Sequence, residues 1–235
     1  MKLTYYGHAC FLANVGGKNL LFDPYITLNE LAKNVDTESI PVDYLLLSHG
    51  HEDHIADAEA ILKRTGAKLI SNYEIVTWFG GKGFEDGHPM NHGGAWNFDF
   101  GKVKYLNAVH SSVLPDGTYG GNPGGFLIQG VDETFYYAGD TALTMDMKLI
   151  PDMAKLNFAI LPLGDNFTMG VDDAVKAAEF IQCDKIIGMH YDTFGFIEID
   201  HNEAKDKFKQ AGKELFLMNI GETVEVGSEA VANNN

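Results

Sequence analysis

The sequence predicts an α/β fold in which two mixed β-sheets pack face to face and helices cover their outer faces, a four-layer αββα sandwich. Three observations support this class. The chain has 235 residues, of which 45% are hydrophobic, enough for a substantial core. Short strand-like runs separated by turn residues fill the first half. Later, strand and helix patterns alternate, so each half supplies a sheet with its helices.

The first half begins with strand signals and then adds helices. The expected strands are short apolar runs bounded by turn residues, at 2–6, 10–15, 19–23, 42–48 and 67–71. A helix is expected over 55–66, ending at Gly66, and a short one over 73–79. The apolar face of the first helix comprises Ile55, Ala58, Ile61 and Leu62.

The second half has four strand signals in succession and then an alternating pattern. The four strands are expected at 95–100, 102–110, 124–130 and 133–140. After them, strands are expected at 158–163, 185–190, 214–218 and 222–226, with helices at 171–182 and 202–212. No linker or repeat interrupts the pattern. Residues 1–227 are therefore expected to form a single domain, and 228–235 a disordered tail.

Composition narrows the classes of partner. The formal charge of −16 disfavours nucleic acid and anionic membrane surfaces, because the mean field repels polyanions. No apolar run approaches the ~18 residues that a membrane span needs. Cys10 and Cys183 form no CxxC pair and define no disulfide framework. A cytoplasmic protein acting on a small molecule is expected, and a homo-oligomer is compatible with the sequence.

The densest chemical signal lies in residues 45–61, LLLSHGHEDHIADAEAI. An apolar strand signal there leads directly into His49, His51, Asp53 and His54. Side chains at strand ends are held by the sheet yet exposed at its edge, as a catalytic site requires. Three later strand signals end in residues of the same ligand types: His110, Asp140 and His190.

Imidazole and carboxylate ligands suit zinc, manganese or iron, and the set contains no cysteine. It is too large for one tetrahedral zinc ion, and it suits two divalent ions that keep positions open for water. Zinc is expected first, with manganese or iron as alternatives. His88, His92 and His201 lack this spacing and are expected to be ordinary hydrogen-bonded surface residues.

The motif HxHxDH, present as HGHEDH, followed by His110, Asp140 in AGD and His190 in MHYDTF, resembles the metallo-β-lactamase superfamily over essentially the whole chain. YYGHACF at 5–11, HSS at 110–112 and LPLGDNFTMG at 161–170 resemble its UlaG-like branch, and more narrowly the UPF0173 metal-dependent hydrolase group. The resemblance implies the αββα fold, in agreement with the pattern of elements. Two metal positions are also implied, one held by His49, His51 and His110 and the other by Asp53, His54 and His190, with Asp140 bridging both.

The expected reaction is hydrolysis, in which a hydroxide bridging the two metal ions attacks an ester-like bond of a lactone, thioester or phosphoester. Metal coordination lowers the pKa of water to about 7, so the nucleophile exists at neutral pH. Asp53 is suited to orient it and take its proton. His8 is either a turn histidine bonded to backbone or, as the resemblance implies, a catalytic residue that contacts substrate or donates a proton.

Other residues are weaker candidates for substrate binding. Ser111 lies beside a ligand, and Asp165, Asn166 and Thr168 either contact substrate or cap the helix that follows. The glycine-rich loop 117–125 is a mobile connection or a loop that covers substrate. Three alternative functions stay open: a phosphodiesterase or nuclease acting on RNA or DNA, an iron-dependent oxidoreductase, and a non-catalytic metal-binding protein.

Overall fold

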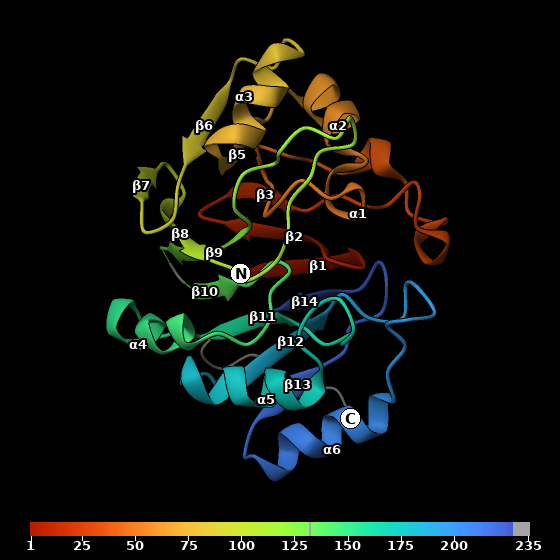
Figure 1. Ribbon diagram of the computed structural model, residues 1–235, viewed down its shortest axis with the longest axis vertical. Coiled ribbons are helices and arrows are strands. Elements are labelled where there is room, and N and C mark those ends of the chain that lie inside the picture. The colour runs from red at the N-terminus through yellow and green to blue at the C-terminus, as the bar shows by residue number, and fades with distance from the viewer. Residues whose placement is uncertain (132, 228–235) are drawn as a thin grey trace.

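The computed structural model describes residues 1–131 and 133–227, so the expected tail 228–235 lies outside the described residues. Two seven-stranded sheets form its centre (Figure 1). The first sheet has the order β14 (Thr223–Glu225), β1 (Lys2–Gly7), β2 (Cys10–Val15), β3 (Lys18–Phe22), β4 (Tyr44–Leu46), β5 (Lys68–Asn72) and β6 (Gly87–Met90). The second has the order β13 (Glu214–Phe216), β12 (Lys185–Met189), β11 (Phe158–Pro162), β10 (Thr134–Tyr137), β9 (Gly124–Gly130), β8 (Gly101–Asn107) and β7 (Ala95–Phe98).

Helices cover the outer sides of both sheets, which confirms the four layers expected from the sequence. Figure 1 shows α2 (Ala58–Thr65) and α3 (Tyr73–Gly81) beyond the first sheet, and α5 (Val171–Phe180) and α6 (His201–Gln210) beyond the second. The remaining helical segments are short: α1 (Glu52–Ile55), α4 (Ile150–Met153), and the 3-10 turns Glu30–Ala32, Thr37–Ser39 and Met145–Leu149. In the described part of the chain, no helix has the length and apolar character needed to cross a membrane.

Aromatic side chains fill the space between the sheets. Phe22 of the first sheet packs against Phe126, Phe135 and Tyr137 of the second, with ring centroids 4.7–6.2 Å apart. All four residues are fully buried, and such contacts add to the free energy of burial. A second apolar cluster lies under α2 and α3 and includes Leu45, Leu69 and Phe79. The two sheets therefore form one rigid support for the loops at their edges.

Most expected elements are present, with three informative differences. The helix expected over 55–66 is two helices, α1 and α2, because the chain turns at Asp57. That buried carboxylate accepts hydrogen bonds from the backbone N–H groups of Ile26 and Thr27 and so holds the turn. The sequence did not predict β6, whose residues GHPM contain the weak strand formers Gly and Pro, nor α4, which is a single turn.

One edge of the structure collects the loops that matter for chemistry. β3, β4 and β5 run parallel, and so do β10, β11 and β12, so their carboxyl ends face the same edge of each sheet. Ligand-type side chains follow at this edge, as is usual for functional residues in parallel sheets.

Candidate metal centre

The structure brings the seven expected ligand residues together from four loops. His49 lies three residues after β4, and the single turn α1 follows it. That turn carries Asp53 and His54 side by side, with His51 at its N-terminus. The other three residues, His110, Asp140 and His190, come after β8, β10 and β12. Residues far apart in the chain thus meet where the two sheets adjoin.

His49, His51 and His110 form the first group, in which one ring nitrogen from each lies within 4.8 Å of the others. The His49 Nε2 and His51 Nδ1 atoms are 2.9 Å apart. Two nitrogens bound to one tetrahedral zinc at ~2.0–2.1 Å lie only about 3.3 Å apart, so these atoms need move little to share an ion. The geometry suits one metal ion held by three imidazoles.

The second group consists of Asp53, His54 and His190, with His8 beside them, again within 4.8 Å. Asp53 Oδ2 lies 3.7 Å from Nε2 of both His54 and His190. A carboxylate with two imidazoles is an ordinary ligand set for zinc, manganese or iron.

Asp140 lies between the two groups. Its Oδ2 is 2.9 Å from His190 Nε2 and 3.3 Å from His54 Nε2 in the second group, and 3.5 Å from His110 Nε2 in the first. The other oxygen, Oδ1, is buried and has no hydrogen-bond partner among the described residues, and the same holds for His54 Nε2. Buried polar atoms rarely stay unpaired, so orphaned donor atoms aimed into a cluster of ligand side chains fit a bound metal ion.

Electrostatics separates the two groups. Burial lowers the pKa of His49, His51 and His110, which favours the neutral imidazole that metal ligation requires. Burial also acts to lower the pKa of His190, but the carboxylates of Asp140 and Asp53 outweigh it and raise that pKa to about 9. Metal binding at the second group therefore displaces a proton that the carboxylates otherwise hold there.

Asp23 is a buried residue that the sequence reasoning missed as part of the site. It accepts hydrogen bonds from Ser48 N (2.7 Å) and Ser48 Oγ, His54 Nδ1 (2.9 Å) and the Tyr137 hydroxyl (2.8 Å). Although it lies within ligand distance of His49 and His54, these donors already use its lone pairs. Asp23 therefore supports the ligands by fixing the His54 ring so that Nε2 faces Asp140. Its only sequence signal is an aspartate at a strand end.

His8 faces the metal centre, from the turn between β1 and β2. The ring Nε2 is 3.0 Å from Asp53 Oδ2, and Nδ1 is 2.9 Å from Thr193 Oγ1. Its carbonyl accepts a hydrogen bond from the backbone N–H of His190 (2.8 Å). Burial lowers the pKa of His8 to about 4, so the ring is neutral near pH 7. An ionised Asp53 can only accept, so Nε2–H donates to it and Nδ1 accepts from the Thr193 hydroxyl.

Thr193→Val should lower the free energy of unfolding of the metal-free protein by about 1–3 kcal/mol, since the buried His8 Nδ1 would lose its partner. Urea unfolding followed by circular dichroism measures the change. Thr193→Ser keeps the hydroxyl and should stay near the wild type. Equal stability of the valine and serine variants would show that Nδ1 is not held by Thr193.

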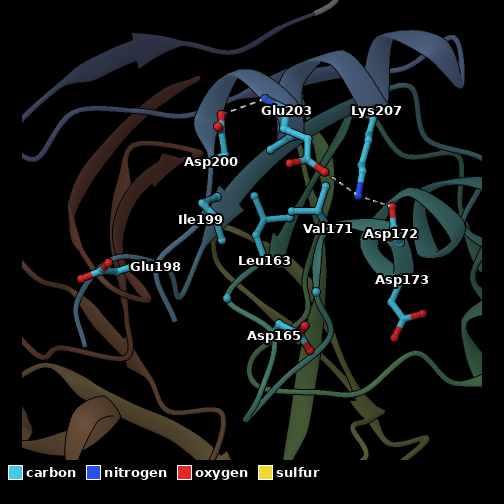
Figure 2. A pocket seen from close by; sticks show the side chains of 13 residues that line it. Leu163, Asp165, Val171, Asp172, Asp173, Glu198, Ile199, Asp200, Glu203 and Lys207 are labelled. Carbon is cyan, nitrogen blue, oxygen red and sulfur yellow. Dashed lines mark hydrogen bonds and ion pairs between the residues drawn. The ribbon is translucent and has the colours of Figure 1, made fainter. Parts of the chain in front are cut away.

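The residues expected to bind substrate differ in position. Ser111 Oγ lies 3.3 Å from His51 Nε2, at the metal centre. Asp165 instead lines a hollow of about 440 Å³ between α5 and α6, to which none of the seven ligand residues contributes (Figure 2). The backbone N–H of Asn166 donates to Asp165 Oδ1, and the Thr168 hydroxyl donates to the carbonyl of Met169. The capping alternative is wrong, because α5 begins after Gly170 without a side-chain cap.

The glycine-rich loop 117–125 is tied to the site rather than free. Its Gly120 carbonyl accepts from Asn72 Nδ2 (2.8 Å) and Ser112 Oγ (2.9 Å). A side chain at Gly120 would collide with Ser112, so glycine is needed for this close approach. A covering role for the loop stays a prediction.

The other three histidines are engaged elsewhere. His88 packs beside Trp96, His92 Nε2 bonds the carbonyl of Pro123, and His201 pairs with Asp192. None belongs to the ligand groups found among residues 1–131 and 133–227.

Comparison with known proteins relates the chain to one family over nearly all its length. The family model "Beta-lactamase superfamily domain" matches residues 2–190. A UPF0173 metal-dependent hydrolase of Christiangramia forsetii is 60% identical, over 96% of this chain and all of the relative, and one of Flavobacterium johnsoniae is 58% identical over the same shares. Among solved structures, Igni18, described as a novel metallo hydrolase from Ignicoccus hospitalis, has a TM-score of 0.87 at 37% identity, covering 95% of this chain and 97% of that one.

Proposed function

Because the chain belongs to the β-lactamase superfamily and, within it, to the UPF0173 metal-dependent hydrolases, we propose that it hydrolyses an ester-like bond of a small molecule with two bound metal ions. The observation that carries the proposal is the position of Asp140, whose carboxylate adjoins histidines of both ligand groups. With a single ion bound, one of the two ligand groups would coordinate no metal. Lactones, thioesters and phosphoesters are the candidate substrates.

The site residues divide into those that would bind the metal ions and those that would transfer protons. His49, His51 and His110 would hold one ion, and Asp53, His54 and His190 the other, with Asp140 between them. When bound, such ions supply an activated water as attacking hydroxide and polarise the oxygen of the scissile group. Zinc is the first candidate, with manganese or iron as alternatives.

Asp53 and His8 would act on protons. Of the two carboxylate ligands, Asp53 is the one whose side chain is partly exposed, so it can reach an attacking water, orient it and accept its proton. His8 Nε2 touches the same carboxylate oxygen at 3.0 Å. His8 could therefore give its Nε2 proton to the leaving oxygen and take, in its place, the proton that Asp53 has accepted.

Purification with metal supplementation, elemental analysis and a hydrolase screen test the proposal. About two transition-metal ions per chain are expected. We also expect turnover of at least one substrate among 4-nitrophenyl esters, lactones, thioesters and bis(4-nitrophenyl) phosphate. His49→Ala is the negative control and should lose both an ion and the activity. Protein that holds its metal and cleaves none of these bonds would contradict the proposed activity.

A further inference from the structure

The described loops around the metal centre contain no lysine or arginine. These ligand-edge loops comprise residues 7–9, 23–29, 47–54, 108–123, 138–144, 163–170 and 190–200. All of them lie within the described residues, and none carries a lysine or an arginine, although the chain has 17 such residues. Their exposed charges are acidic and include Glu52, Asp116, Asp165 and Glu198. An anionic group away from the reacting bond would meet no cation on these loops.

Among the described residues that line the hollow beside Asp165, Lys207 is the one basic side chain, and it already forms ion pairs. Figure 2 shows its side chain between two carboxylates, with Nζ 2.9 Å from Asp172 and 3.1 Å from Glu203. These two carboxylates already offset its positive charge, which reduces its attraction for an anion at the metal centre. The hollow therefore offers no substitute anchor for an anion.

These loops carry aromatic side chains where a site for an anionic substrate would carry lysine or arginine. The rings of Tyr25 and Phe194 lie 5.5 and 5.4 Å from the His8 ring and 6.2 Å from each other. On the same set of loops, Phe167 and Phe196 are 51% and 78% exposed, and their ring centroids are 6.3 Å apart. Exposed aromatic residues grouped beside a functional centre mark a surface that receives an apolar ligand.

The two loops that carry these phenylalanines are attached to the metal ligands. The backbone N–H of Met169, two residues after Phe167, donates to the carbonyl of Thr141, the neighbour of Asp140 (2.9 Å). Phe194 and Phe196 follow His190 on the other loop, and Gly164 fits closely against the His190 carbonyl. Phe194 therefore adjoins His8 at the metal centre, and Phe167 and Phe196 lie on loops that contact Thr141 and His190.

We infer that the substrate is electrically neutral away from its reacting bond and carries an alkyl or aryl group that packs against Phe167, Phe194 and Phe196. The inference rests on the proposed function and narrows its substrates to esters, lactones and thioesters without a remote charged group. Substrates with a carboxylate or phosphate away from the reacting bond are disfavoured, because no lysine or arginine of these loops would offset the desolvation of that charge. An apolar chain, in contrast, gains from leaving water.

Two hydroxamic acids of equal length test this without turnover, because the hydroxamate binds the metal ions. Octanohydroxamic acid ends in a methyl group and suberic acid monohydroxamate in a carboxylate. Calorimetry with metal-loaded protein should give a Kd at least about tenfold lower for the octanoyl compound, a difference of ~1.4 kcal/mol. Equal or tighter binding of the suberate compound overturns the inference.

Variants locate the apolar contact. Phe167→Ala with Phe196→Ala should raise the Kd of octanohydroxamic acid about fivefold to tenfold and leave that of suberic acid monohydroxamate within about twofold. Trp96→Ala removes another aromatic, 56% exposed and outside the ligand-edge loops, and should change neither value. An unchanged octanoyl Kd in the double variant would also overturn the inference.

Esters then connect binding to turnover. 4-Nitrophenyl pentanoate should exceed mono-(4-nitrophenyl) glutarate in kcat/KM, and the double variant should reduce that preference. Metal-loaded protein that shows the hydroxamate preference but cleaves no ester would contradict the hydrolase activity while supporting the neutral ligand. Protein that cleaves both esters but prefers the glutarate would support the hydrolase activity and contradict the neutral substrate.

Discussion

Asp140→Asn should bind no more than about one metal ion per chain and lose at least 100-fold to 1000-fold in kcat/KM on the best ester. The carboxylate Oδ2 lies within 3.5 Å of three histidines that belong to both ligand groups. A neutral amide of the same shape cannot bridge two cations, and it leaves their charges uncompensated. Several kcal/mol of transition-state stabilisation from the metal pair would be lost, and each ~1.4 kcal/mol is a factor of ten in rate. Elemental analysis and steady-state kinetics on the same preparation measure both effects.

Asp152→Asn makes the same chemical change on an exposed position of α4 and should leave metal content and rate unchanged. Full metal content in Asp140→Asn would show that the two groups do not depend on this residue. Loss of rate with both ions retained would assign Asp140 to the reaction instead of to metal binding.

Asp23→Asn should destabilise the metal-free protein by about 3–5 kcal/mol and weaken metal binding about 10-fold to 100-fold. The buried carboxylate receives hydrogen bonds from Ser48, His54 and Tyr137, and the amide NH₂ would face one of these donors with another donor. The His54 ring would lose the bond that directs Nε2 to Asp140. Denaturant unfolding gives the stability, and competition with a chromogenic chelator gives the metal affinity.

Asp57→Asn separates the two effects of Asp23→Asn. Asp57 is also buried and accepts three hydrogen bonds, from the backbone of Ile26 and from the backbone and hydroxyl of Thr27. It bonds no ligand residue, so its loss should lower stability and leave metal affinity unchanged. Equal weakening of metal binding in both variants would mean that Asp23 acts only through stability.

The sequence predicted the fold well because its signals are periodic and local. Alternating apolar runs fix strands, and the stripe on residues 58–62 fixes α2, which buries Ala58, Ile61 and Leu62. The elements it missed, β6 and α4, are short and contain residues with weak propensity. The break between α1 and α2 depends on Asp57 bonding a segment thirty residues away, and no local pattern reports such a contact.

The site residues, like the fold, could be predicted where the signal is local in the sequence and were missed where the role depends on long-range contacts. His49, His51, Asp53 and His54 have a spacing that is rare by chance, so they were found at once. Asp23 and Thr193 are single residues whose role comes from the partners that the fold brings to them. The aromatic surface was also missed, because exposure of Phe167 and Phe196 cannot be read from one sequence. The UlaG-like branch and the single domain stay predictions.

Each ligand group draws two members from the loop after β4 and one from the second half of the chain. His49 and His51 meet His110, and Asp53 and His54 meet His190. During synthesis, neither group can close until its distant histidine has been made, and the second must wait for residue 190. Each ion would then cross-link the two parts of the chain. Sliding one sheet past the other would therefore require breaking coordinate bonds. A loaded protein should for this reason resist mechanical extension and protease attack far longer than its ion-free form.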